Sequence, residues 1–458
     1  MAGAGKSAIA HTVAQHCDNH GLLASSFFFD RNIPDRRSPQ KLFSTIARDL
    51  LKLGNNLSDD VRLILENDRS IATACQSRQF DELILEPFLR HRMGRPVVIV
   101  IDGLDEGYDL ETLRIFRDKV SKLPGTFRIF LTSRPLDDIV MDLSNASHVL
   151  HRSIDIHSDV NQRDIAVYIR NRLHYIASRR RLAADWLGTE RTEAFISKAE
   201  GLFIWASTIT EDLLTVAHPD RKLSTFLYES NILGVPAEAK MDVLYADILS
   251  TCRWSDEGYV KDYQLLIGTI MAAKSPLSPS ALRSLHRNNP KLDIDEVLRP
   301  LSSLLTGVFD HNQPIQILHL SFRDFLTCRA QSSLDHQHFH VNEKDHNQKL
   351  AILCIRILNE DLTSRTPGAG YLTADTEGIP LINSSHISEV LWYACRFWTE
   401  HIVEIEDSVS QTFLDSLCNF LETKSIVWME VLSTQYPFQS LSRVRAWLQV
   451  RALQQTVW

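Results

Sequence analysis

Three short apolar segments in the first third of the chain constrain the fold more than any other feature. Each is rich in β-branched or aromatic residues, as buried strands are. They are LLASSFFFD (22–30), PVVIVIDG (96–103) and FRIFLTSRP (127–135). The stretches between them carry apolar residues at helical spacing. Apolar strands that alternate with helices are typical of a parallel sheet covered on both faces, so residues 1–150 are predicted to form an α/β domain.

Beyond residue 150 the strand signal fades and apolar residues recur at helical spacing. Residues 151–235, which include the apolar run GLFIWASTITEDLL (201–214), are predicted to form a helical domain. Residues 236–330 combine helices, the turn KSPLSPS (274–280) and the run PIQILHLSFRDFL, a pattern that resembles a winged helix. Residues 331–458 are predicted to form a C-terminal helical region.

The chain opens on AGAGKS (2–7), which has most of a phosphate-binding loop. Glycines let backbone N–H groups converge on phosphate oxygens, the lysine neutralises charge, and the hydroxyl residue holds Mg²⁺. The nucleotide-binding residues predicted here are Gly3, Ala4, Gly5, Lys6, Ser7 and Ala8. The pattern G-x-x-x-x-G-K-[ST] places its first glycine one position before Met1. We therefore expect an incomplete loop and a sheet without its first strand.

An acidic residue ends the second apolar segment, as in a Walker B strand. The carboxyl end of a parallel strand faces the phosphates, so Asp102 is predicted to bind Mg²⁺ together with Ser7. Asp105 and Glu106 follow, and one of them, preferably Glu106, is predicted to orient or deprotonate an attacking water. Arg134, after the third segment, is predicted to sense the terminal phosphate. A strand-ending carboxylate, a solvated acidic loop and a surface salt bridge are the alternative interpretations.

Five motifs in order resemble the NACHT domain of fungal signalling NTPases, a group also described as similar to the nephrocystin-3 N-terminal region. They are AGAGKSAIAHTVAQ, SFFFDR, LFSTIARDL, PVVIVIDGLDE and FLTSRP. The resemblance implies a switch of the STAND class that binds ATP and ADP, or GTP and GDP, with Mg²⁺, and hydrolyses slowly. It also implies oligomerisation on activation, unknown signalling partners and a link to non-self recognition or cell death. ILHLSFRDFL (317–326) resembles the winged-helix motif of the wider superfamily, which makes His319 a candidate contact of the β-phosphate; a core histidine is the alternative.

Charge and cysteine usage narrow the partners and the compartment. A formal net charge of −8 gives no general reason to bind nucleic acid or an anionic membrane, so neither is expected as a partner. Seven scattered cysteines indicate neither a zinc site nor a disulfide framework, and together with the lack of a leader they favour the cytoplasm. A second hypothesis is a scaffold protein with a degenerate loop that no longer binds nucleotide. A fragment, or a start assigned too far downstream, predicts the same incomplete loop.

Overall fold

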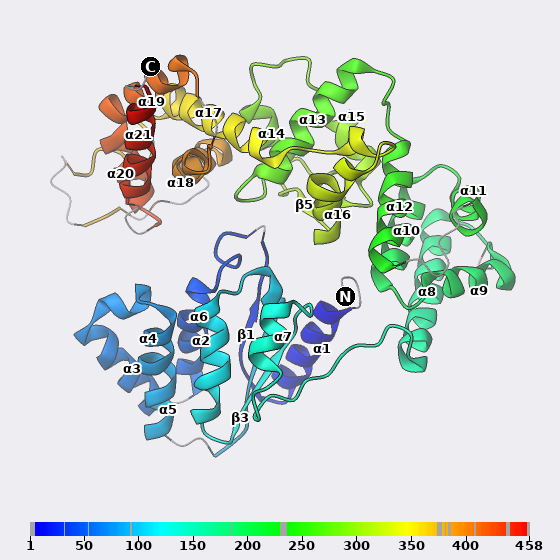
Figure 1. Cartoon of the computed structure of the whole chain (residues 1–458), viewed down its shortest axis with the longest axis horizontal. Helices are drawn as coiled ribbons and strands as arrows, with labels where there is room; N and C mark the ends of the chain where they lie inside the picture. The colour runs from blue at the N-terminus through cyan, green and yellow to red at the C-terminus, as the bar shows by residue number, and fades with distance from the viewer. Residues whose placement is uncertain are drawn as a thin grey trace. The chain divides into compact units, whose positions relative to one another are not determined.

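The computed structural model describes the chain in two compact units that divide between residues 241 and 242. The described residues are 5–31, 33–53, 55–91, 94–183, 185–229, 236–372, 378–380, 382, 386–406, 409–436 and 440–455. Unit 1 begins with an α/β part and continues into helices, and unit 2 is almost entirely helical (Figure 1). The predicted boundaries at 150, 235 and 330 stay predictions, because the contacts divide the chain only once.

A three-stranded parallel sheet lies at the centre of the α/β part. Its strands pair in the order β1-β2-β3, and their bounds are β1 Leu23–Phe28, β2 Val97–Asp102 and β3 Phe127–Leu131. The register pairs Phe28 of β1 with Asp102 of β2, and Ile101 of β2 with Leu131 of β3. All three predicted strands are confirmed. Their carboxyl ends consequently lie at one edge of the sheet, next to each other.

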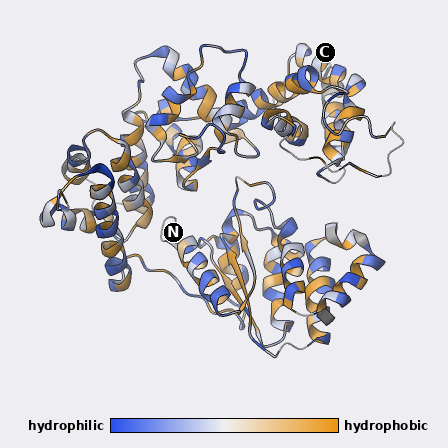
Figure 2. Cartoon of the chain, turned by 180° about the vertical axis from the view of Figure 1, so that it is seen from behind, coloured by the Kyte–Doolittle hydropathy of each residue, from blue (hydrophilic) through white to orange (hydrophobic). Residues whose placement is uncertain are grey.

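Helices cover both faces of this sheet, as the apolar segments predicted. Alternate residues of β2 point to opposite faces, and Val100 packs under α1 (Lys6–Asn19), against Ala10 and Ala14. Ile99 and Ile101 face the other side, into a larger core that includes α2 (Leu42–Leu50) and α6 (Leu110–Asp118). Figure 2 shows the resulting concentration of apolar residues along the strands. Burial on both faces explains why these strands lack polar alternation.

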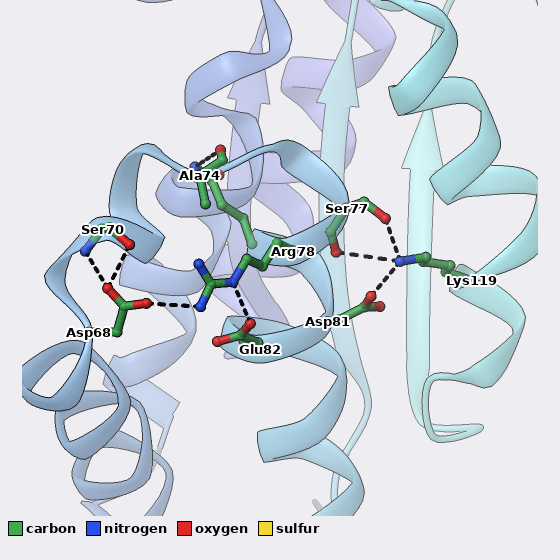
Figure 3. A network of polar contacts seen from close by, with 9 residues as sticks. Asp68, Ser70, Ala74, Ser77, Arg78, Asp81, Glu82 and Lys119 are labelled. Carbon is green, nitrogen blue, oxygen red and sulfur yellow. Dashed lines mark hydrogen bonds and ion pairs between the residues drawn. The ribbon is translucent and has the colours of Figure 1, made fainter.

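A helical insertion between β1 and β2 is tied to the sheet layer by a polar network (Figure 3). The insertion comprises α3 (Asn55–Asn67) and a continuous helical stretch from α4 (Gln76–Phe80) through α5 (Glu86–Arg90). Lys119, after α6, bonds the Ser77 hydroxyl at 2.5 Å and pairs with Asp81. Arg78 pairs with Glu82 at 2.7 Å within the insertion itself. The contacts of Lys119 therefore tie the insertion to the segment that follows α6. After β3, the short helix α7 (Asp137–Leu143) packs against α6.

The helical part of unit 1 confirms the predicted change from strands to helices. Its helices are α8 (Asp159–Arg180), α9 (Gly188–Ala199), α10 (Phe203–Thr215) and α11 (Pro219–Ser224). Gly201, between α9 and α10, has a φ of 78°, and a Cβ there would lie 1.9 Å from the carbonyl oxygen of Ile156. No side chain fits this junction. Helix α12 (Ala237–Ser250) begins in unit 1, where buried Lys240 pairs with Glu200 at 2.8 Å.

Unit 2 begins within α12 and consists of further helices with one short hairpin. The helices are α13 (Glu257–Ala272), α14 (Pro279–Leu285), α15 (Ile294–Leu298), α16 (Leu320–Asp324), α17 (Glu343–Asp361), α18 (Glu389–Val403), α19 (Gln411–Thr423), α20 (Ser425–Ser433) and α21 (Ser442–Gln455). The hairpin pairs β4 (Leu305–Thr306) with β5 (Gln316–Ile317) between α15 and α16. Helices followed by a hairpin are compatible with the winged-helix expectation without establishing it. No helix in the described part of the chain is long and apolar enough to cross a lipid bilayer.

Candidate functional site

The first turn of α1 has the geometry of an anion-binding helix start. Gly5 is its N-cap, with φ 81° and ψ 14°, a left-handed conformation that glycine adopts without strain. Lys6 is the first helical residue, and the first turn contains no acidic residue. Ser7 and Ala8 follow and are exposed. The free N–H groups of a helix start and its dipole attract anions, so this turn suits a phosphate. Gly3 and Ala4, also predicted to contribute, lie outside the described residues.

Asp102 ends β2 and is nearly buried, with 5% of its surface exposed. The hydroxyl of Thr132, which follows β3, donates a hydrogen bond to the Asp102 carboxylate. The same hydroxyl accepts the N–H of Gly103 at 3.0 Å. The side chain of Asp102 is thereby held by the neighbouring strand. Sequence analysis missed Thr132, although a hydroxyl residue at the end of an adjacent parallel strand was the available signal.

Asp105 and Arg134 form a nearly buried pair on the loops that follow β2 and β3. The Arg134 N–H donates to one carboxylate oxygen of Asp105 at 2.8 Å, and its Nε lies 3.2 Å from the other. The Asp105 side chain is only 4% exposed. Both carboxylate oxygens of Asp105 are thus engaged by Arg134, which orients the arginine. Of the two acids in the turn, Glu106 is therefore the better candidate to exchange a proton with water.

Glu106 has the properties of a group that exchanges protons near neutral pH. Burial, followed by the charges of Asp105 and Asp30, raises the pKa of its carboxyl from 4.5 to about 7, against the lowering effects of Arg31 and Arg134. A general base is most effective when its pKa lies close to the working pH. The side chain folds back over Gly103, whose φ of 69° allows the sharp turn after β2. The geometry therefore favours Glu106 as the candidate base.

Lys6, at the start of α1, interacts electrostatically with the same charged groups. Burial lowers the pKa of its amine most strongly and Arg134 lowers it as well, whereas Asp105, Asp102 and Glu106 raise it. A cation at the helix start and carboxylates at the ends of β2 are consequently within electrostatic reach of one another. The structure thus brings Lys6 together with the predicted charged residues of the loops after β2 and β3. Among the described residues no group of three His, Cys, Asp or Glu side chains forms a metal cage. A magnesium site of one hydroxyl, one carboxylate and phosphate oxygens needs no such cage.

An aromatic side chain from the helical part also reaches the start of α1. A Cβ built on Gly5 would lie 4.0 Å from Cδ2 of Phe203, the first residue of α10. The Phe203 ring meets Tyr168 of α8 edge to face, with 5.7 Å between the ring centroids. Both rings are partly exposed. From sequence, Phe203 was interpreted only as part of an apolar run, because a contact between residues 5 and 203 has no local signal.

His319 belongs to unit 2, where it is the N-cap of α16. Its Nδ1 accepts the N–H of Ser321 at 3.2 Å and lies 2.6 Å from the Ser321 hydroxyl. That hydroxyl also bonds the hydroxyl of Tyr245, on α12, at 2.7 Å. Because Nδ1 accepts a backbone N–H, Nε2 carries the proton of the neutral ring. The predicted phosphate contact of His319 stays a prediction.

The comparison with known families covers the part of the chain that holds the site. Residues 1–134 match the family model described as nephrocystin 3, N-terminal. This family is related to NACHT-like domains. No curated protein is detectably similar to the chain. The match begins before the helix start of α1 and ends at Arg134, so it includes all the predicted site residues except His319.

Proposed function

We propose that this protein is a nucleotide-dependent molecular switch of the STAND class, with slow hydrolysis of ATP or GTP. The observation that carries the proposal is the helix start at Gly5 and Lys6, which shares one charged site with Asp102, Glu106 and Arg134. Helix starts with a left-handed glycine and a lysine bind phosphates, and acids at the ends of parallel strands bind the accompanying cation. The family match over residues 1–134 supports the same function.

Each site residue has a proposed role that follows from its surroundings. The first-turn N–H groups and Lys6 hold the phosphates, and Ser7 and Asp102 hold Mg²⁺. Bound Mg²⁺ neutralises the charge that develops on the phosphates. Glu106 orients an attacking water and accepts its proton, for which a pKa of about 7 is suited. Arg134, oriented by its pair with Asp105, responds to the terminal phosphate.

The helical segments have proposed roles in the switch. Phe203, which lies at Gly5, is proposed to supply an aromatic surface against the bound nucleotide. By the resemblance of residues 317–326 to a winged-helix motif, His319 has the proposed role of binding the β-phosphate in the closed state. Differential affinity for the diphosphate and triphosphate forms shifts the equilibrium between closed and open states. By its resemblance to fungal NACHT proteins, the open state oligomerises in the cytoplasm in non-self recognition or cell-death signalling.

Equilibrium binding of labelled ATP, ADP and GTP to the full chain tests this proposal. We expect binding that requires Mg²⁺ for the triphosphates and that weakens at least tenfold in Lys6→Ala, because the lysine charge faces the phosphate position. Lys52→Ala is the matched control, since Lys52 belongs to the same part of the chain and its side chain is 76% exposed. Absence of binding, or equal loss in both variants, would refute the switch and favour the alternative of a scaffold with a degenerate loop.

A further inference from the structure

A loop that follows β1 and Phe29, described at residues 30–31 and 33–37, lies beside the candidate base. The N–H of Asp30 donates to the carbonyl of Arg36 at 3.1 Å, and the N–H of Arg37 donates to the carbonyl of Ile33 at 2.9 Å. These bonds draw the two ends of the loop together. The loop carries three arginines, none of which entered the sequence-based site.

This loop packs tightly against the turn that holds Glu106. A Cβ built on Gly107 would lie 2.5 Å from Cδ1 of Phe29 and 2.9 Å from the carbonyl oxygen of Arg37. Such distances leave room for a hydrogen atom only, so backbone meets backbone at this point. A displacement of the loop after β1 therefore displaces the turn after β2 as well.

Arg31 makes the polar contact between the two segments. Its Nη2 donates to the backbone carbonyl of Asp105 at 3.2 Å. The carboxylate of the same residue is held by Arg134 from the loop after β3. The residue that precedes Glu106 is thus held by its carbonyl from the β1 side and by its side chain from the β3 side. Two arginines, on the loops after β1 and β3, thus hold the turn in place.

We propose that Arg31 is a further positioning residue of this site, which holds the Asp105 carbonyl and thereby fixes the turn that carries Glu106. The role rests on the proposed nucleotide-dependent function. Arg31 acts through the turn and needs no contact with the nucleotide. It complements Arg134, which holds the same turn by the carboxylate of Asp105.

The charges around Glu106 make this role measurable. Asp105 faces it from its own turn, Asp30 and Arg31 from the loop after β1, Arg134 from the loop after β3, and Lys6 from α1. Burial, Asp105 and Asp30 raise the pKa of the Glu106 carboxyl, and Arg31 and Arg134 lower it. Two consecutive residues of one loop, Asp30 and Arg31, therefore act on Glu106 in opposite directions. If the loop only supported the fold, substitutions at Asp30 and Arg31 would have no reason to move the pKa of Glu106 in opposite directions.

An infrared pH titration of the full chain, labelled with ¹³C-glutamate, measures the protonation of Glu106 without nucleotide. The signal that disappears in Glu106→Gln identifies this carboxyl, and we expect its midpoint near pH 7. Arg31→Ala is expected to move the midpoint to higher pH, and Asp30→Asn to lower pH. Arg36→Ala is the control from the same loop, because only the backbone of Arg36 closes the loop; it is expected to leave the midpoint in place.

Arg31→Lys keeps the charge and serves if the alanine variant does not fold; we expect its midpoint close to that of the unaltered chain. An unchanged midpoint in folded Arg31→Ala, or movement in the same direction for Arg31→Ala and Asp30→Asn, would overturn the proposal. The proposal would also be overturned if the midpoint of Arg31→Lys were displaced as far as that of Arg31→Ala. Hydrolysis profiles against pH, recorded on the same variants, separate the two proposals. If the midpoints shift as expected but no nucleotide binds, the switch fails and the Arg31 proposal stands. If nucleotide is hydrolysed but the midpoints do not move, only the Arg31 proposal fails.

Discussion

Replacement of Glu106 by glutamine is expected to stabilise the α/β part of unit 1 at alkaline pH. Burial raises the pKa of this carboxyl from 4.5 to about 7, which means that the folded state resists its ionisation. Between these two pH values the folded chain binds more protons at Glu106 than the unfolded chain does. The free energy of unfolding therefore falls as the pH rises through this window, and the full penalty is present above pH 7. Glutamine has a similar shape and no charge, so it removes the penalty.

The size of the effect follows from the pKa difference. At about 1.36 kcal/mol per pKa unit, the difference between 4.5 and about 7 corresponds to about 3 kcal/mol as an upper limit. Glu106 is partly exposed, and solvent screens such interactions, so we expect about 1–2 kcal/mol at pH 8. At pH 5 the folded-state carboxyl is protonated, so most of the difference between the two proteins should disappear.

Hydrogen exchange is the suitable assay because all eight tryptophans lie after residue 180 and do not report on the sheet. Amide exchange in peptides that cover β2 measures the opening of the central strand. At pH 8 we expect Glu106→Gln to slow this exchange by roughly 5- to 30-fold, the factor that corresponds to about 1–2 kcal/mol. At pH 5 the two proteins should exchange at nearly equal rates.

The matched control is Glu66→Gln, because Glu66 lies on the exposed surface of α3 and pairs with Arg62. It should leave the exchange of β2 unchanged at both pH values. Equal exchange in Glu106→Gln and the unaltered chain at pH 8 would refute the reasoning that burial holds this carboxyl protonated. If Glu106→Gln slowed the exchange of β2 at pH 5 and not at pH 8, the predicted direction of the pH dependence would be refuted.

Three further predictions follow from buried contacts in both units. Gly107→Ala should destabilise the α/β part by roughly 1–3 kcal/mol, because the new methyl group meets the Phe29 ring; hydrogen exchange of β2 measures this, and unchanged exchange would contradict the packing. Lys240→Met should lower the melting temperature of unit 1, because it removes the buried partner of Glu200; a melt followed by tryptophan fluorescence that shows no change would indicate a solvated pair. Burial lowers the pKa of His346 from 6.5 to about 4, so the folded state resists protonation of this ring. The free energy of unfolding of unit 2 should therefore fall as the pH falls from 6.5 through 4. His346→Gln should weaken this dependence on pH in melts followed by tryptophan fluorescence.

The residues of the site differ in how far sequence alone predicts them. Asp102 and Lys6 lie at positions that a local pattern identifies. Asp102 is the acid that ends an apolar strand, and Lys6 is the lysine that begins a helix after a glycine. Local patterns of this kind follow from the covalent chain. Thr132, Arg31 and Phe203 carry no such local pattern. Their importance arises from contacts between loops and helices that lie far apart in the chain.

The sequence by itself determined the three strands, the helices on both faces of the sheet and the helical character of the chain beyond residue 150. These features depend on local periodicity and on burial, which apolar patterns report directly. Only the tertiary structure decided how the acids of the LDE turn, residues 104–106, divide their tasks. Asp105 is engaged by Arg134 on the neighbouring loop, whereas the Glu106 carboxyl has a pKa raised to about 7. Burial and the charges of three separate loops produce this difference. Neither can be predicted from the presence of two adjacent acidic residues in the sequence.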